Sequence, residues 1–177
     1  MADSMTKEAV FELAGLLSQL PQDQVDQLVA ELRREQPDLY DYFQSLHRLF
    51  PDAREYNQIV GIGYTIWQIL QRSAQPPGRV TMEMIYQANE AYAAELKRLT
   101  TGPAEARKKA AARVALNHPE PALLVYLAVV IKAGGPSWQD QTYVLASNAL
   151  RVLLDALIAS RGSGASRPAG MVPVGRA

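Results

Sequence analysis

The chain has 177 residues, of which 48% are hydrophobic, a formal net charge of zero and no cysteine. This length suits one domain, and the hydrophobic fraction is enough for a buried core instead of a disordered chain. The lack of cysteine excludes disulfides, thiolate metal sites and cysteine nucleophiles. The first residues contain acids and no basic run, so we expect no secretory signal and a cytoplasmic location.

The charges are unevenly distributed along the chain. Residues 1–60 carry eleven acids and five bases, whereas residues 61–177 carry seven acids and thirteen bases, which gives −6 and +6. Two interpretations follow. The two regions neutralise each other within one fold, or they favour head-to-tail association between molecules.

Prolines divide the first part of the chain into predicted helices. The first helix should begin near Ser4 or Thr6 and end at Leu20, because Pro21 has no N–H group and clashes with the preceding turn. Three prolines mark such helix breaks: Pro21, Pro37 and Pro51. Each is followed within two residues by an acid, which favours a new helix N-terminus through capping and the helix dipole.

The segment Tyr56–Leu70 is the most apolar predicted helix of this half. Its hydrophobic residues repeat at steps of three and four, and no charge lies between Glu55 and Arg72. We therefore expect this helix at the centre of a bundle. Gly61 and Gly63 each disfavour a helix by about 1 kcal/mol relative to alanine, a cost that a close-approaching neighbouring backbone would explain.

The second half predicts four more helices. Thr81 is a good N-cap for a helix over Met82–Leu99, and an alanine-rich helix follows Pro103. This alanine-rich helix is the least core-like and should lie on the surface. The next segment, Pro121–Lys132, is apolar on every side and is predicted to be buried. Its apolar run is ten residues, shorter than the roughly 20 needed to span a bilayer.

The last predicted helix covers Gln141–Arg161, with Tyr143 on its inner face and Arg151 and Asp155 on its outer face. Residues 162–177 are rich in glycine, serine, alanine and proline and carry basic charge. We expect them to form a disordered tail. The predicted fold is therefore an all-α single compact bundle of seven to eight helices over residues 1–161, followed by a flexible tail.

Known cofactor and metal motifs are missing from the sequence. The pair Gly61 and Gly63 does not extend to GxGxxG, because position 66 is isoleucine and no strand precedes it. The two histidines, His47 and His118, have no glutamate three residues before them, so we expect no metal site and no cofactor. Asp155 is the nearest approach to a catalytic carboxylate, and Arg151 at i−4 should form an ion pair with it.

Arg113 and His118 are separated by four residues. This R-x4-H spacing resembles the catalytic motif of HEPN-type ribonucleases, which are also all-helical. In that family the arginine and the histidine line an RNA cleft, usually at a dimer interface, and the histidine serves in acid–base chemistry. The resemblance implies a ribonuclease in which Arg113 and His118 are catalytic. A histidine at a helix C-terminus also interacts favourably with the helix dipole, which leaves a structural role open.

A basic run is the strongest electrostatic feature. Its members are Lys97, Arg98, Arg107, Lys108, Lys109 and Arg113. Such a run can neutralise several phosphates of a nucleic acid. Three of these cations are consecutive and therefore point around the helix, and no aromatic side chain is interleaved with them to stack bases. A solvated face is the alternative interpretation.

Trp138 lies in a loop rich in glycine, proline and serine. It is a candidate anchor for a partner, because tryptophan is enriched at binding hot spots, or else it fills the core. With no reactive constellation in the sequence, the leading hypothesis is a non-enzymatic helical adaptor or accessory subunit that binds a protein partner or a second copy of itself. The alternatives are a nucleic-acid-binding subunit that uses residues 97–113 and the HEPN-like ribonuclease.

Overall fold

The computed structural model describes residues 5–134, 138 and 140–161. Within these ranges the chain forms eight α-helices and no strand, so the predicted all-α bundle is confirmed. The helices are α1 (Lys7–Leu17), α2 (Gln22–Glu35), α3 (Pro37–Ser45), α4 (Ala53–Gln71), α5 (Met82–Thr100), α6 (Ala104–Asn117), α7 (Pro121–Gly134) and α8 (Asp140–Ala159), with a short 3₁₀ turn at Leu46–Arg48 after α3. The predicted tail, residues 162–177, lies outside the described residues.

Side-chain caps fix the starts of three helices where the sequence predicts them. Thr6 accepts a hydrogen bond from the backbone N–H of Ala9 at the start of α1, and Asp52 caps α4 in the same way. Thr81 caps α5 by accepting from the backbone N–H of Met84. Helix α1 ends at Leu17, earlier than predicted, because the chain turns at Ser18.

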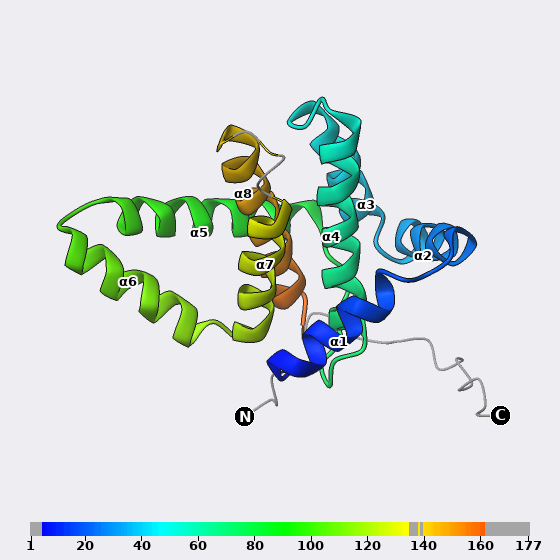
Figure 1. Cartoon of the computed structure of the whole chain (residues 1–177), viewed down its shortest axis with the longest axis horizontal. Coiled ribbons are helices and arrows are strands. Elements are labelled where there is room, and N and C mark those ends of the chain that lie inside the picture. Colours follow the sequence, from blue (N-terminus) through cyan, green and yellow to red (C-terminus); the bar gives the residue numbers. More distant parts are fainter. Residues whose placement is uncertain (1–4, 135–137, 139, 162–177) are drawn as a thin grey trace.

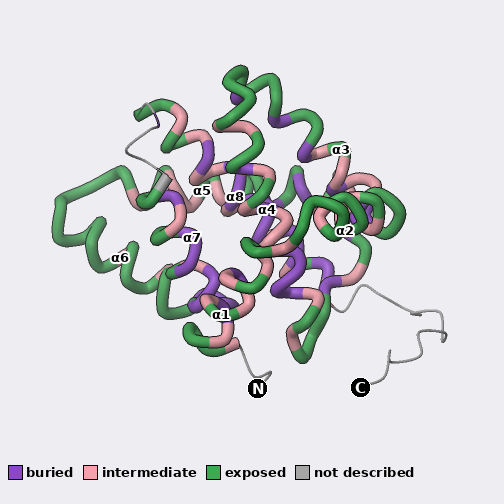
Figure 2. Tube along the Cα trace, turned by 45° about the vertical axis from the view of Figure 1, so that its right-hand side comes forward, coloured by how far each residue is buried: buried purple, intermediate pink, exposed green. Residues whose placement is uncertain are grey.

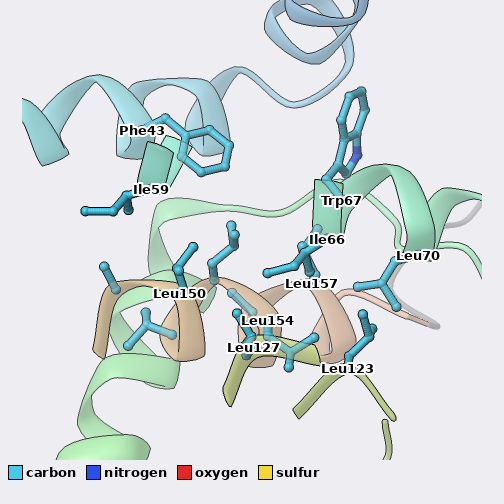
Figure 3. Packing of buried hydrophobic residues seen from close by; sticks show 14 of the residues in the cluster. Phe43, Ile59, Ile66, Trp67, Leu70, Leu123, Leu127, Leu150, Leu154 and Leu157 are labelled. Atoms are coloured by element: carbon cyan, nitrogen blue, oxygen red, sulfur yellow. The ribbon is translucent and has the colours of Figure 1, made fainter. Parts of the chain in front are cut away.

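Helices α4 and α8 form the centre of the bundle (Figure 1). Helix α8 packs against α4, α5 and α7. The side chains of Ile66 from α4, Leu154 from α8 and Leu127 from α7 converge in the core (Figure 3). Ile66 and Leu154 are fully buried. The prediction that Tyr56–Leu70 forms the central helix is therefore confirmed.

The two glycines of α4 lie in different surroundings. A Cβ atom added at Gly63 would lie 2.4 Å from the Cε1 atom of the Phe43 ring and 3.2 Å from a methyl group of Leu153. A close neighbour was predicted here, but the neighbour is an aromatic side chain and not a backbone. For Gly61 the prediction was wrong, because this residue is exposed and no atom lies within 4 Å of an added Cβ.

Helix α7 is not buried on every side, and this prediction was wrong. Its inner residues, among them Leu123 and Leu127, are buried, but Val125 and Val129 are 40% and 46% exposed. Helices α1, α6 and α8 pack against α7 and leave its outer face open. That outer face carries Val125, Ala128, Val129 and Lys132, all exposed.

Helices α5 and α6 form a hairpin whose turn points away from the other helices, while α5 packs against α8 (Figure 1). Helix α6 contains no buried residue, and the tube of Figure 2 is mostly coloured as exposed along it. The predicted surface position of this helix is confirmed. In α8, Tyr143 is 41% exposed instead of facing inward, since the buried residues of that helix begin at Ala146.

Helix α8 is the one helix of the described residues that is long and apolar enough to cross a membrane by length and composition. Helices α6 and α7 meet that test only as a pair, and the pair is bent by 120°. Eight residues of α8 are buried in the core, and a buried core helix has the same composition.

Candidate functional site

A cavity of about 460 Å³ lies between the α5–α6 hairpin and α8. It is lined by Glu95 from α5, by Arg113, Val114 and Asn117 from α6, by His118 and Pro119 from the corner after α6, and by Arg151, Asp155, Ile158 and Ala159 from α8. Both residue pairs that the sequence singled out, Arg113 with His118 and Arg151 with Asp155, therefore meet in one cavity.

A chain of polar contacts crosses the floor of this cavity. His118 Nε2 lies 3.0 Å from Asp155 Oδ1, and Arg151 Nε donates to Asp155 Oδ2 at 2.9 Å. Arg151 also pairs with Glu95 at 3.6 Å and lies over the ring of Tyr92, 5.4 Å from its centroid. The predicted i−4 ion pair is confirmed. The chain of contacts joins α5, the α6–α7 corner and α8.

The surroundings of His118 determine what its ring is able to do. Its side chain is 4% exposed, and its Nδ1 atom accepts a hydrogen bond from the backbone N–H of Glu120 at 3.1 Å. An accepting Nδ1 carries no proton, so Nε2 carries it and donates to Asp155. Both ring nitrogens are thus occupied within the protein.

Two further groups lie near His118: Tyr92, whose ring packs against Arg151, and Arg113, which lines the cavity. Burial raises the pKa of the Tyr92 hydroxyl, and the nearby Arg151 partly opposes this shift. Arg113 is exposed, and no hydrogen bond or ion pair of its side chain occurs within the described ranges. Of the two residues in the R-x4-H pattern, His118 is held by hydrogen bonds within the fold and Arg113 is exposed to solvent.

Replacing His118 with alanine should lower the free energy of unfolding by about 1–2 kcal/mol, because Asp155 and the Glu120 N–H both lose a partner. Chemical unfolding measures this change. Asn89→Ala, at an exposed position on α5, is the control and should shift stability by less than about 0.5 kcal/mol. RNA cleavage that is present in the wild type and lost in a fully stable His118→Ala protein would contradict this structural role.

Sequence reasoning missed a second polar pair next to this cavity. Arg161 Nη1 donates to Glu120 Oε1 at 2.6 Å, and Arg161 Nη2 donates to Ser73 Oγ at 3.2 Å. The side chains of Glu120 and Arg161 are 3% and 13% exposed. The one local signal was the position of Glu120 just before α7, where an acid favours a helix N-terminus.

The remaining candidates are spread over the surface or buried. All six cations of residues 97–113 are exposed, and none of them forms an ion pair in the part of the chain that the structure describes. Trp138 is 7% exposed, and its indole N–H donates to Gln58 Oε1 at 2.9 Å, which matches a core role. The described residues contain no group of three or more acids and histidines placed to hold a metal ion.

Comparisons with protein families, with curated proteins and with solved structures gave no match to this chain. The resemblance to HEPN-type ribonucleases therefore rests on Arg113 and His118 alone.

Proposed function

We propose that this protein is a non-enzymatic interaction protein, an adaptor or accessory subunit that binds a partner through the outer face of α7. One observation carries the proposal. Val125 and Val129, one helical turn apart on the most apolar stretch of the chain, are 40% and 46% exposed. A surface helix normally places polar residues on its solvent side.

The outer face of α7 continues along the helix. Ala128 lies between the two valines, and Lys132 follows at the end of the stripe, so the apolar surface has a polar edge. Apolar patches with polar edges mark protein interaction sites. Covering such a face yields about 25 cal/mol for each Å² of apolar surface that is removed from water.

The cavity beside α8 supports the non-enzymatic part of the proposal. Four of its polar side chains, Glu95, His118, Arg151 and Asp155, bind one another, and the histidine that the ribonuclease hypothesis requires has both nitrogens occupied. A polar network of this kind stabilises the contact between the α5–α6 hairpin and α8. In this proposal the cavity holds the hairpin in place and does no chemistry.

The exposed cations of α6 fit a protein partner better than a nucleic acid. Helix α6 has no aromatic residue on which a base would stack, and Leu116, on the same helix, is 81% exposed. Bound nucleic acid is one of the outcomes that the experiment below distinguishes.

The test introduces Val125→Glu and Val129→Glu together into the tagged full chain. Partners are then captured from cells that express the wild type or a variant. We expect the double variant to recover at least about tenfold less of the wild-type partner, since tenfold corresponds to about 1.4 kcal/mol of binding free energy. Thermal unfolding confirms that the variant is folded.

The matched control is Val144→Glu with Leu49→Glu, which adds the same two charges at residues that are 56% and 48% exposed elsewhere. It should recover the partner as the wild type does. Equal recovery by all three proteins would overturn the proposal. So would a wild-type protein that elutes with strong absorbance at 260 nm and loses it at high salt, because that result indicates bound nucleic acid.

A further inference from the structure

A groove lined by leucines separates α1 from α2. It encloses about 500 Å³ and is lined by Leu13, Leu16, Leu17, Leu20 and Leu28, with Asp23 and Glu31 among its polar residues. Leu16 is 59% exposed. Arg72, the one base in the lining, is hydrogen-bonded to Gln68 of its own helix.

The groove is open because its two walls belong to different parts of the bundle. Helix α1 packs against α4 and α7, whereas α2 packs against α3. The leucines between α1 and α2 are therefore only partly covered: Leu16 is exposed, and the other four are of intermediate burial. An apolar groove between two helices is the type of site that receives a third, amphipathic helix.

Helix α6 has the complementary features. Lys109, Arg113 and Leu116 are spaced at i, i+4 and i+7, so two cations and an apolar side chain share one exposed face. Helix α6 carries four bases and one acid, a net charge of +3. Residues 7–35, which form α1 and α2, carry six acids and three bases, a net charge of −3.

We propose that α6 of one molecule binds in the α1–α2 groove of a second copy of this chain. Leu116 lies among the groove leucines, and Lys109 and Arg113 face Asp23 and Glu31. Leucine contacts supply affinity, and the opposite charges guide the approach and fix the orientation. In this arrangement the acidic first part of one molecule attracts the basic second part of its neighbour.

The arrangement of the helices requires the contact to be intermolecular. Helices α6 and α2 lie at opposite ends of the longest axis of the molecule in Figure 1, and they remain far apart in the turned view of Figure 2. Helix α6 cannot reach the groove of its own chain. Each molecule offers one groove and one α6, so the contact is head-to-tail and builds a ring or an open chain.

This association goes beyond the proposed function, because it uses neither Val125 nor Val129. The two proposals therefore fail separately. Partner capture tests the face of α7, and the mass of the purified protein tests the groove and α6.

The experiment measures mass by light scattering during size exclusion, at several protein concentrations and at low salt. The variants are Leu16→Glu, which places a charge in the groove, and Leu116→Glu, which places one on α6. We expect the wild type to form species of two or more chains whose mass rises with concentration and falls at high salt. Each variant alone should elute as the 19.5 kDa monomer.

An equimolar mixture of the two variants is the decisive sample. Leu16→Glu keeps an intact α6, and Leu116→Glu keeps an intact groove, so one functional contact forms between them and growth stops there. The mixture should contain species of twice the monomer mass and nothing larger. A symmetric dimer that uses the same patch twice would not give this pattern.

The control is Leu49→Glu, at an exposed leucine outside the groove, which should assemble as the wild type does. Lys109→Glu is a second α6 variant at an exposed position and should also weaken assembly. A wild type that is monomeric at every concentration, or a variant mixture that stays monomeric while both variants are folded, would overturn the proposal. Absorbance at 260 nm that disappears at high salt would assign the α6 cations to nucleic acid and overturn it as well.

Discussion

Replacing Glu120 with alanine is expected to destabilise the domain by about 3–5 kcal/mol, because it leaves the Arg161 guanidinium buried without a counter-charge. The two side chains are 3% and 13% exposed and lie 2.6 Å apart. Their contact joins the residue just before α7 to the second residue after α8. Urea unfolding of the full chain measures the loss.

Two further proteins test the explanation for Glu120. Glu35→Ala removes a pair with Arg34 whose side chains are 68% and 37% exposed, and it should change stability by less than about 0.5 kcal/mol. The double variant Glu120→Leu with Arg161→Met removes both buried charges and should recover most of the stability. The explanation would be contradicted by a Glu120→Ala protein as stable as the wild type, or by a double variant no more stable than the single one.

The two glycines of α4 should respond to alanine with opposite signs. At Gly63 the new methyl group would lie 2.4 and 2.7 Å from two atoms of the Phe43 ring. That ring is fully buried and stacked on Tyr64 with centroids 5.1 Å apart, so it has little room to move. Gly63→Ala should therefore destabilise by about 1–3 kcal/mol through overpacking.

Gly61→Ala is the matched control for Gly63→Ala. It adds the same methyl group two residues away on the same helix, where nothing lies within 4 Å. Alanine favours a helix over glycine, so this variant should gain up to about 1 kcal/mol. Urea midpoints with unchanged slopes measure both effects. If both variants were more stable than the wild type, helix propensity, and not the Phe43 contact, would decide the effect of alanine at Gly63.

The helices and their starts could be predicted because the signals are local. Thr6, Asp52 and Thr81 each bind a backbone N–H two or three residues further on, so the sequence around each cap contains both partners. The exposed outer face of α7 could not be predicted in this way. A helix that is apolar on all sides has no periodicity to show which side its neighbours will cover.

The sequence identified several residues of the candidate site but not the long-range contacts between them. The R-x4-H pattern names two residues that both line the cavity, but the partners that bind the two nitrogens of the His118 ring are a backbone N–H and a carboxylate 37 residues away. Helical periodicity put Arg151 and Asp155 on the outside of α8. The α5–α6 hairpin folds over them, and that long-range contact makes the surface pair part of a cavity.

Helix α6 contributes no buried side chain, and this has an evolutionary consequence. Substitutions there change the surface that the molecule presents, while the cost in folding free energy stays small as long as the helix is kept. The charged and apolar side chains of α6 are therefore free to diverge between descendants of this protein without a compensating change in α4 or α8. The surface of α6 and the core of the bundle can therefore evolve separately.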